Sequence, residues 1–153
     1  MKRRIIAFIL AVSMIMLIPL SVSASEVNTY SEEVVWFEDG SSLVITILVN
    51  NSRTSGTKSG TKQYTYRDSN GDLSWIAQLN GTFTYNGTTS TCTASSCNVT
   101  IYDSSWYNIS KSASKSGNTA TATVTMGLKV LGVTISKPTH NLTLTCDKDG
   151  NLS

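Results

Sequence analysis

Residues 73–85 decide the fold class of this chain, and they read LSWIAQLNGTFTY. One parity carries apolar or small side chains throughout, namely Leu73, Trp75, Ala77, Leu79, Gly81, Phe83 and Tyr85. The other parity is polar apart from Ile76. Alternation with a period of two over this length matches a strand and no helical repeat. We therefore predict one long strand, with Gly81 as the place where it bends or bulges.

The same period appears on both sides of this stretch. Residues 43–49 are apolar on both faces, which is typical of a central strand. Residues 119–126 alternate Thr with Ala, Val and Met, which again fits a strand. Shorter strands are predicted at residues 34–37, 62–67, 99–102, 106–112, 129–135 and 141–146, and residues 50–60 and 92–97 are interpreted as loops.

The whole pattern indicates an all-β fold of about nine short strands separated by turn residues, with no segment of helical period. The favoured architecture is an antiparallel β-sandwich of Greek-key or immunoglobulin-like topology. A small closed barrel is the alternative. From Ser25 onward, 41 of 129 residues are Ser or Thr, and we expect these to form the outer, solvated faces of the sheets.

The N-terminus has the organisation of a secretory signal. Lys2, Arg3 and Arg4 precede an apolar run over residues 5–18, and residues 22–24 are small. This order of a basic, an apolar and a small-residue region predicts a cleaved signal helix, residues 1–24, with cleavage after Ala24. Residues 25–153 would then form a single secreted domain. An uncleaved anchor is the alternative, but the run is shorter than the roughly 20 residues that a spanning helix needs.

Removal of the signal changes the charge of the protein. Three basic residues leave with it, so nine Lys and Arg face ten Asp and Glu, and the net charge becomes −1. The remaining basic residues are scattered along the chain, whereas binding to nucleic acid requires a cationic cluster. We therefore expect no nucleic-acid partner and no stable membrane anchor after cleavage.

Three cysteines remain after processing, and export favours one disulfide with one thiol left over. Only four residues separate Cys92 from Cys97, which would place them across the mouth of a hairpin within bridging distance. Cys146, at the end of the last predicted strand, is the rival partner for Cys92 or Cys97. We expect the Cys92–Cys97 pair, and the rival remains open.

Candidate catalytic and metal-binding residues are few. His140 is the only histidine, which removes every metal site built on two imidazoles. No serine lies in a Gly-x-Ser-x-Gly elbow, and a turn-side histidine after Pro138 is more often structural or solvated. The Asp-rich turns at residues 68–72 and 147–151 lack the spacing of an EF-hand. We therefore expect no catalytic residues, no metal and no cofactor.

Trp106 and Tyr107 are the candidate binding residues. Adjacent residues of a strand point to opposite faces, so one of these two rings must leave the core or lie at an edge. An exposed ring among Asn, Ser and Thr can stack on a sugar or contact a partner. The alternative is ordinary packing of both rings.

The segments at residues 81–85, 111–118 and 142–147 resemble those of small exported β-rich proteins of Gram-positive bacteria for which no activity is assigned. The resemblance implies export and a β fold, and it implies no functional residue. Together with the absences above, it favours a secreted, non-enzymatic binding or interaction module for a glycan, the cell wall or a protein surface. A bacteriocin-like or toxin-like effector and an uncharacterised secreted hydrolase are the alternatives.

Overall fold

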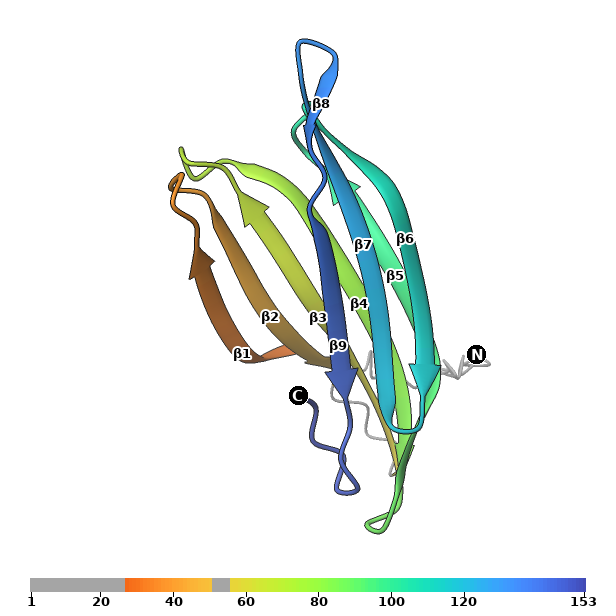
Figure 1. Ribbon diagram of the computed structural model, residues 1–153. Coiled ribbons are helices and arrows are strands. Elements are labelled where there is room, and N and C mark those ends of the chain that lie inside the picture. The colour runs from red at the N-terminus through yellow and green to blue at the C-terminus, as the bar shows by residue number, and fades with distance from the viewer. Residues whose placement is uncertain (1–26, 51–55) are drawn as a thin grey trace, which may run out of the picture.

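The structure, a computed structural model, describes residues 27–50 and 56–153. These residues form two antiparallel sheets (Figure 1). The larger sheet contains β1 (Val27–Trp36), β2 (Ser42–Asn50), β3 (Thr57–Arg67), β4 (Leu73–Tyr85) and β5 (Ser90–Ile101). The smaller sheet contains β6 (Trp106–Ser116), β7 (Thr119–Val130), β8 (Val133–Ser136) and β9 (Thr139–Thr145). The expected all-β fold of antiparallel sheets and about nine strands is confirmed.

The strands are connected mainly in chain order. The larger sheet has the order β1-β2-β3-β4-β5, and the chain then enters the smaller sheet at β6. Short β8 pairs with the last residues of β7, and β9 returns to pair with the rest of β7. Among the strands of the described residues, β9 is the one that pairs with a strand other than its neighbour in the chain, because it returns to β7.

The core lies between the two sheets and follows the parity expected from residues 73–85. Trp75, Ala77, Leu79 and Phe83 of β4 are fully buried. Opposite them, the smaller sheet buries the apolar parity of β7 and β9: Ala120, Ala122, Val124, Met126, Leu142 and Leu144. The Thr residues that alternate with the apolar residues of β7 lie on its other face.

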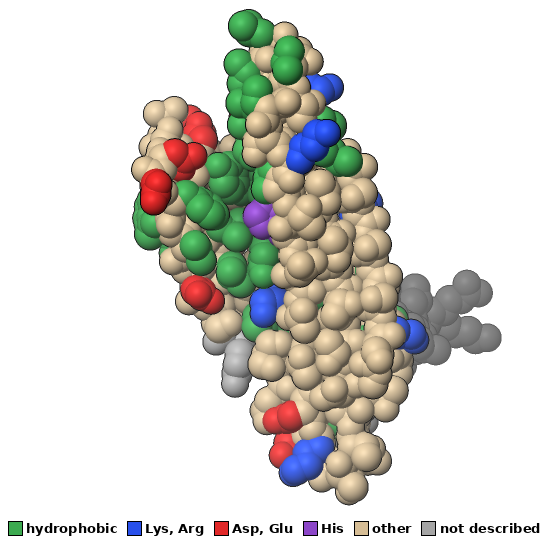
Figure 2. Space-filling model, viewed as in Figure 1, with side chains coloured by type: hydrophobic (Ala, Val, Ile, Leu, Met, Phe, Trp, Pro, Cys, Tyr) green, Lys and Arg blue, Asp and Glu red, His purple; other side chains and the backbone are tan. Residues whose placement is uncertain are grey.

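The larger sheet is wider than the smaller one. The smaller sheet lies against β3, β4 and β5, whereas β1 and β2 extend beyond it (Figure 1). The register places Leu43, Ile45 and Ile47 of β2 on the same face as Tyr64 and Tyr66 of β3. Figure 2 shows the result as hydrophobic side chains gathered in the hollow between β1–β2 and β9.

Several predicted strand boundaries were wrong, β1 for example beginning seven residues before the predicted Val34, and three of the errors concern the fold itself. Residues 92–97 lie within β5 and do not form a loop, because this strand pairs with β4 from Trp75 to Tyr85. Residues 57–60 belong to β3, where Gly60 lies opposite Gly81 and a side chain at Gly60 would overlap Leu152. The single strand predicted at residues 129–135 is a tight hairpin, since Leu131 and Gly132 both have positive φ and turn β7 into β8.

The expected signal segment, residues 1–24 with its cleavage after Ala24, lies outside the described residues. Within residues 27–50 and 56–153, no helix is long and apolar enough to span a bilayer.

Candidate functional site

An open cleft lies at one end of the sandwich, between the ends of strands from both sheets. Its volume is about 330 Å³, which is within the range of small-molecule sites. The larger sheet and its turns contribute Phe37, Asp39, Ser41, Tyr66 and Trp75, and the smaller sheet and its connections contribute Trp106, Leu128, Ser136, Pro138 and His140. Four of the ten lining residues are aromatic, so we call this site the aromatic cleft.

Strand pairing sets the first two rings. Tyr66, near the end of β3, pairs directly with Trp75, near the start of β4, across the hairpin that joins these strands. Their rings are stacked, with centroids 5.4 Å apart and planes 6° from parallel. Phe37 follows β1 and lies 6.2 Å from the Tyr66 ring, tilted by 46°. The turn side of the larger sheet therefore supplies a continuous aromatic wall.

The smaller sheet supplies the facing wall. Trp106 is the first residue of β6, and its ring meets that of Tyr66 at 5.1 Å and 63°. It meets the Trp75 ring at 6.1 Å and 62°. His140, the second residue of β9, lies 5.1 Å from the Trp75 ring. The Trp106 ring therefore stands at 62–63° to the Tyr66 and Trp75 rings. Offset-stacked and edge-to-face arrangements are those that aromatic pairs prefer.

Two buried ring nitrogens in this cluster have no hydrogen-bond partner among the described residues. They are Nε1 of Trp75, whose side chain is 0% exposed, and Nε2 of His140. A buried polar atom without a partner costs about 1–3 kcal/mol. Native structures keep few such atoms, and they are often found where a ligand or water completes the site.

Two lining residues of the cleft, Asp39 and His140, have shifted pKa values. Ser41 donates to Oδ1 of Asp39 from both its backbone N, at 2.9 Å, and its Oγ, at 2.6 Å. These hydrogen bonds lower the pKa of Asp39, so the carboxylate is ionised at neutral pH. Burial lowers the pKa of His140, so the imidazole is neutral there. None of the ten lining residues is Lys or Arg.

The two predicted binding residues lie in different places. Trp106 is 8% exposed and forms part of the aromatic cleft. Tyr107 points to the opposite face, where its ring covers Gly127 and its hydroxyl lies 2.7 Å from Oγ1 of Thr134. The Lys129 ammonium lies 4.3 Å from the Tyr107 ring centroid. Tyr107 is thus packed on β7 and β8, and only Trp106 lies at the cleft.

The cysteines do not follow the expected hairpin. Cys92 and Cys97 lie on the same extended strand, β5, and all three thiols are free. Five residues of strand separate two positions by about 16 Å, far beyond the Cα distance of a disulfide. The Cys92–Cys97 pairing was therefore wrong. Burial raises the pKa of all three thiols.

One of the two rival pairs, Cys92 with Cys146, is brought to one end of the sandwich. The backbone N of Cys92 donates to Gly117 O at 2.7 Å, and that of Cys146 donates to Asn118 O at 3.0 Å. Both cysteines are thus tied to the same turn, the one that joins β6 and β7, at the end opposite the aromatic cleft. A Cys92–Cys146 bridge stays a prediction.

In the Asp-rich turns, aspartate side chains accept hydrogen bonds from backbone N–H groups of the same turn. Oδ1 of Asp68 accepts from the N atoms of Asn70 and Asp72, and Oδ1 of Asp147 accepts from those of Asp149 and Asn151. Their carboxylates act as turn-forming groups. In the part of the chain that the structure describes, no group of three or more His, Cys, Asp and Glu side chains could hold a metal ion.

Sequence reasoning found one member of the cleft and missed the others. The turn-side histidine that we expected is a strand residue whose ring lies against Trp75. Tyr66 and Trp75 flank the predicted turn at residues 68–72, so hairpin pairing alone could have placed their rings side by side. The meeting of Phe37, Trp106 and His140 depends on how the two sheets stack, which no local pattern encodes.

Comparison of the chain with protein-family models, with curated proteins and with solved structures finds no match.

Proposed function

We propose that this protein is a secreted, non-enzymatic binding module that holds part of an extracellular ligand in the aromatic cleft. One observation carries the proposal: four aromatic side chains line an open cleft of about 330 Å³ whose lining includes one carboxylate and no Lys or Arg. Mostly apolar walls with a few polar groups that fix orientation are typical of ligand sites. Aromatic faces stack on the apolar face of a sugar ring, so a cell-wall glycan is the first ligand to test.

The same geometry favours binding over catalysis. A general base requires a nearby proton donor or a group that orients it. Only burial accounts for the lowered pKa of His140, and no carboxylate within residues 27–50 and 56–153 is hydrogen-bonded to it. A neutral imidazole packed against Trp75 fits a recognition surface better than a catalytic pair.

Retention on immobilised cell-wall material tests the proposal. Protein collected from the medium of cells that express the full chain is expected to bind, and Trp106→Ala and Phe37→Ala are expected to elute earlier. Phe37 is 40% exposed, so its removal leaves the core intact. Trp36→Ala is the matched control, because Trp36 is 72% exposed and lies on the other face of β1 from the cleft.

Equal retention of all four proteins would rule out the cleft as the binding site. Killing of bacteria by the purified protein at low concentration would favour the toxin-like alternative. Turnover of a wall polymer that is lost in His140→Ala would favour the hydrolase.

A further inference from the structure

We infer that the free protein forms a two-fold dimer, in which the β7–β8 hairpin (residues 128–136) of each copy lies over the mouth of the other copy's aromatic cleft. This inference goes beyond the proposed function, because it concerns the protein before any ligand is bound. It is drawn from the shape, the polarity and the charge of the hairpin and of the cleft rim.

The β7–β8 hairpin is an apolar projection. It extends beyond the rest of the sandwich at the cleft end (Figure 1), and Figure 2 shows hydrophobic side chains gathered on it. Leu131 is 99% exposed, and Val130, Val133 and Ile135 are 48–65% exposed. Aliphatic side chains that are grouped and exposed in this way mark a contact surface.

The turn of this hairpin is not the one that its backbone favours. Val130 pairs with Val133, so Leu131 and Gly132 form a two-residue turn, and both have positive φ. Asn-Gly or Asp-Gly suits such a turn, whereas a leucine at a φ of 50° is sterically strained. Folding therefore gives no reason for an exposed leucine at this position, and contact with another surface does.

The apolar flank of the hairpin lies on the side of the cleft. Val130 has the same parity on β7 as Leu128, which lines the cleft, and Val133 lies opposite Val130. Lys129 and Thr134 form the next pair and occupy the outer face. The cleft wall therefore continues outward along the hairpin as an exposed apolar strip.

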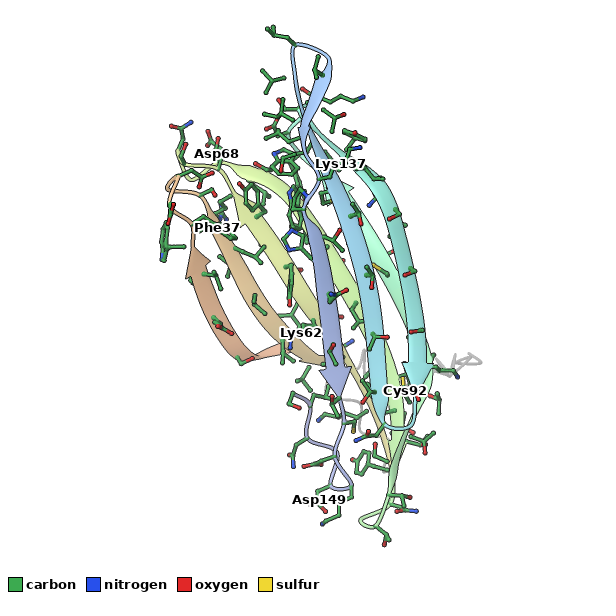
Figure 3. All side chains as sticks on the ribbon, in the orientation of Figure 1. Phe37, Lys62, Asp68, Cys92, Lys137 and Asp149 are labelled. Atoms are coloured by element: carbon green, nitrogen blue, oxygen red, sulfur yellow. The ribbon has the colours of Figure 1, made fainter. Side chains whose placement is uncertain are left out.

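The hairpin is flanked by positive charge. Lys129 and Lys137 lie on either side of it, and the chain has no acidic residue between Asp103 and Asp147. Figure 3 shows Lys137 at the base of the hairpin, across the cleft from Asp68. A surface that accepts this hairpin should therefore be apolar, with acidic groups at its edge.

The rim of the cleft on the larger sheet has these properties. The half-exposed ring of Phe37 lies against Tyr66 and forms its apolar part. Two turns lie side by side here, since a Cβ at Gly40 would be 3.5 Å from that of Ser69. Figure 2 shows acidic side chains along them; these turns contain Glu38, Asp39, Asp68 and Asp72. The chain thus carries both halves of a complementary contact.

A second copy is the occupant that the two halves fit. Both halves lie at the same end of the molecule, so a two-fold axis there lets each hairpin cover the other copy's cleft, and two equal contacts close the assembly. A lipid bilayer is the other surface that an apolar hairpin could enter. It would bring the four acidic residues of the rim to the headgroups together with the two lysines, whereas a second copy pairs these opposite charges.

Sedimentation velocity tests the inference on protein collected from the medium of cells that express the full chain. We expect a dimer that dissociates on dilution. Leu131→Asn removes the apolar tip and suits the turn, since asparagine tolerates positive φ. It should weaken association about a hundredfold, because the dimer loses two buried leucines. Val34→Thr is the control, at a half-exposed position on the outer face of β1, and should change nothing.

A charge swap assigns the contact to these two surfaces. Lys137→Glu and Glu38→Lys alter exposed side chains, and each places like charges at both contacts of the dimer. Each variant alone should therefore associate about tenfold more weakly. In an equal mixture, both contacts of the mixed dimer again join opposite charges, so association should return to within about threefold of the original.

Three results would overturn the inference: a protein that stays monomeric at submillimolar concentration, a dimer that Leu131→Asn does not weaken, or a charge-swapped mixture that associates no better than its components. Sedimentation of monomeric protein with phosphatidylglycerol vesicles, lost in Leu131→Asn, would also overturn it and assign the hairpin to a membrane.

The same variant separates this inference from the proposed function. Leu131 does not line the cleft, so monomeric Leu131→Asn should still be retained on cell-wall material. Loss of the dimer with retention unchanged supports both statements. A dimer that behaves as described, together with no retention of the original protein, would remove the proposed function alone.

Discussion

The two ends of this sandwich are packed differently. At the end where β6 turns into β7, Phe83 and Leu144 are fully buried, and a methyl group added at Gly81 would come within 2.7 Å of the Phe83 ring. At the other end, larger rings meet at steep angles around a cavity of about 330 Å³. We call the first end the closed end because it packs tightly around Gly81, although a polar pocket of about 220 Å³ also opens there beside the β4–β5 hairpin.

Packing serves stability at the first end, and under the proposed function it serves recognition at the second. At the closed end, backbone N–H groups have hydrogen-bond partners. The N atoms of Cys92 and Cys146 donate to Gly117 O and Asn118 O, respectively. The cleft end leaves two buried ring nitrogens unpaired, Trp75 Nε1 and His140 Nε2, and the closed end leaves one hydroxyl, Ser90 Oγ. Unpaired buried atoms cost stability, and departures from good packing concentrate at functional sites. The following changes test whether the two ends respond as differently as this account requires.

The largest expected effect is at the closed end. Phe83→Ala removes a fully buried ring and should lower the free energy of unfolding by about 3–5 kcal/mol. Urea denaturation followed by tryptophan fluorescence measures it. The matched change at the cleft, Phe37→Ala, should cost about 1 kcal/mol or less, since that ring is 40% exposed. Equal losses for the two variants would contradict the comparison.

A smaller loss is expected when the closed end is overfilled. Gly81→Ala places a methyl group against the Phe83 ring and within 3.2 Å of Leu144. Overpacking of this kind should cost about 1–3 kcal/mol, measured as a lower thermal midpoint. Ser96→Ala, at an exposed position of the neighbouring strand, is the control. An unchanged thermal midpoint in Gly81→Ala would show that this end can accommodate an additional methyl group.

The cleft end should show its own dependence on pH. Burial places the folded pKa of His140 below 6.5, so unfolding takes up a proton as pH falls below about 6.5. Stability is therefore full above that pH and falls as pH decreases toward the folded pKa. His140→Phe should remove this part of the loss. Denaturation at pH 7 and pH 5.5 measures it, and an identical decline in both proteins would argue against a buried neutral imidazole.

The aspartates of the acidic turns should affect stability in a lower pH range than His140 does. Hydrogen bonds lower the pKa of Asp39 and Asp147 from 3.8, so their contribution is lost only as pH falls below about 4.

The smallest effect is expected outside both ends. Trp36 is 72% exposed on the outer face of β1, so Trp36→Ala should change the free energy of unfolding by no more than about 0.5 kcal/mol. A large loss in denaturant experiments would reveal a contact of this ring that the described residues do not show.

The sequence predicted the closed end better than the cleft. The alternation around Phe83 and that of residues 119–126 gave the inward faces of β4 and β7, because period two directly sets which side of a sheet a residue occupies. The loop expected at Cys92–Cys97 was wrong because β5 takes its conformation from pairing with β4, and small polar residues carry no period of their own.

The cleft was predictable only in part. Trp106 was singled out because its neighbour Tyr107 had to face the other way, and the two rings do lie on opposite faces. His140 and Phe37 are distant from Trp106 in the chain, and their approach depends on the stacking of the two sheets. Nothing in the local pattern fixes how far the larger sheet extends beyond the smaller one.

The three tryptophans can show whether the aromatic end is the binding end. In a ¹H–¹⁵N spectrum of the secreted protein, each indole N–H gives its own signal, two from the cleft and one from Trp36. On addition of soluble cell-wall fragments, the account predicts shifts for Trp75 and Trp106 and none for Trp36. Binding that shifts Trp36 and leaves the other two unchanged would contradict it.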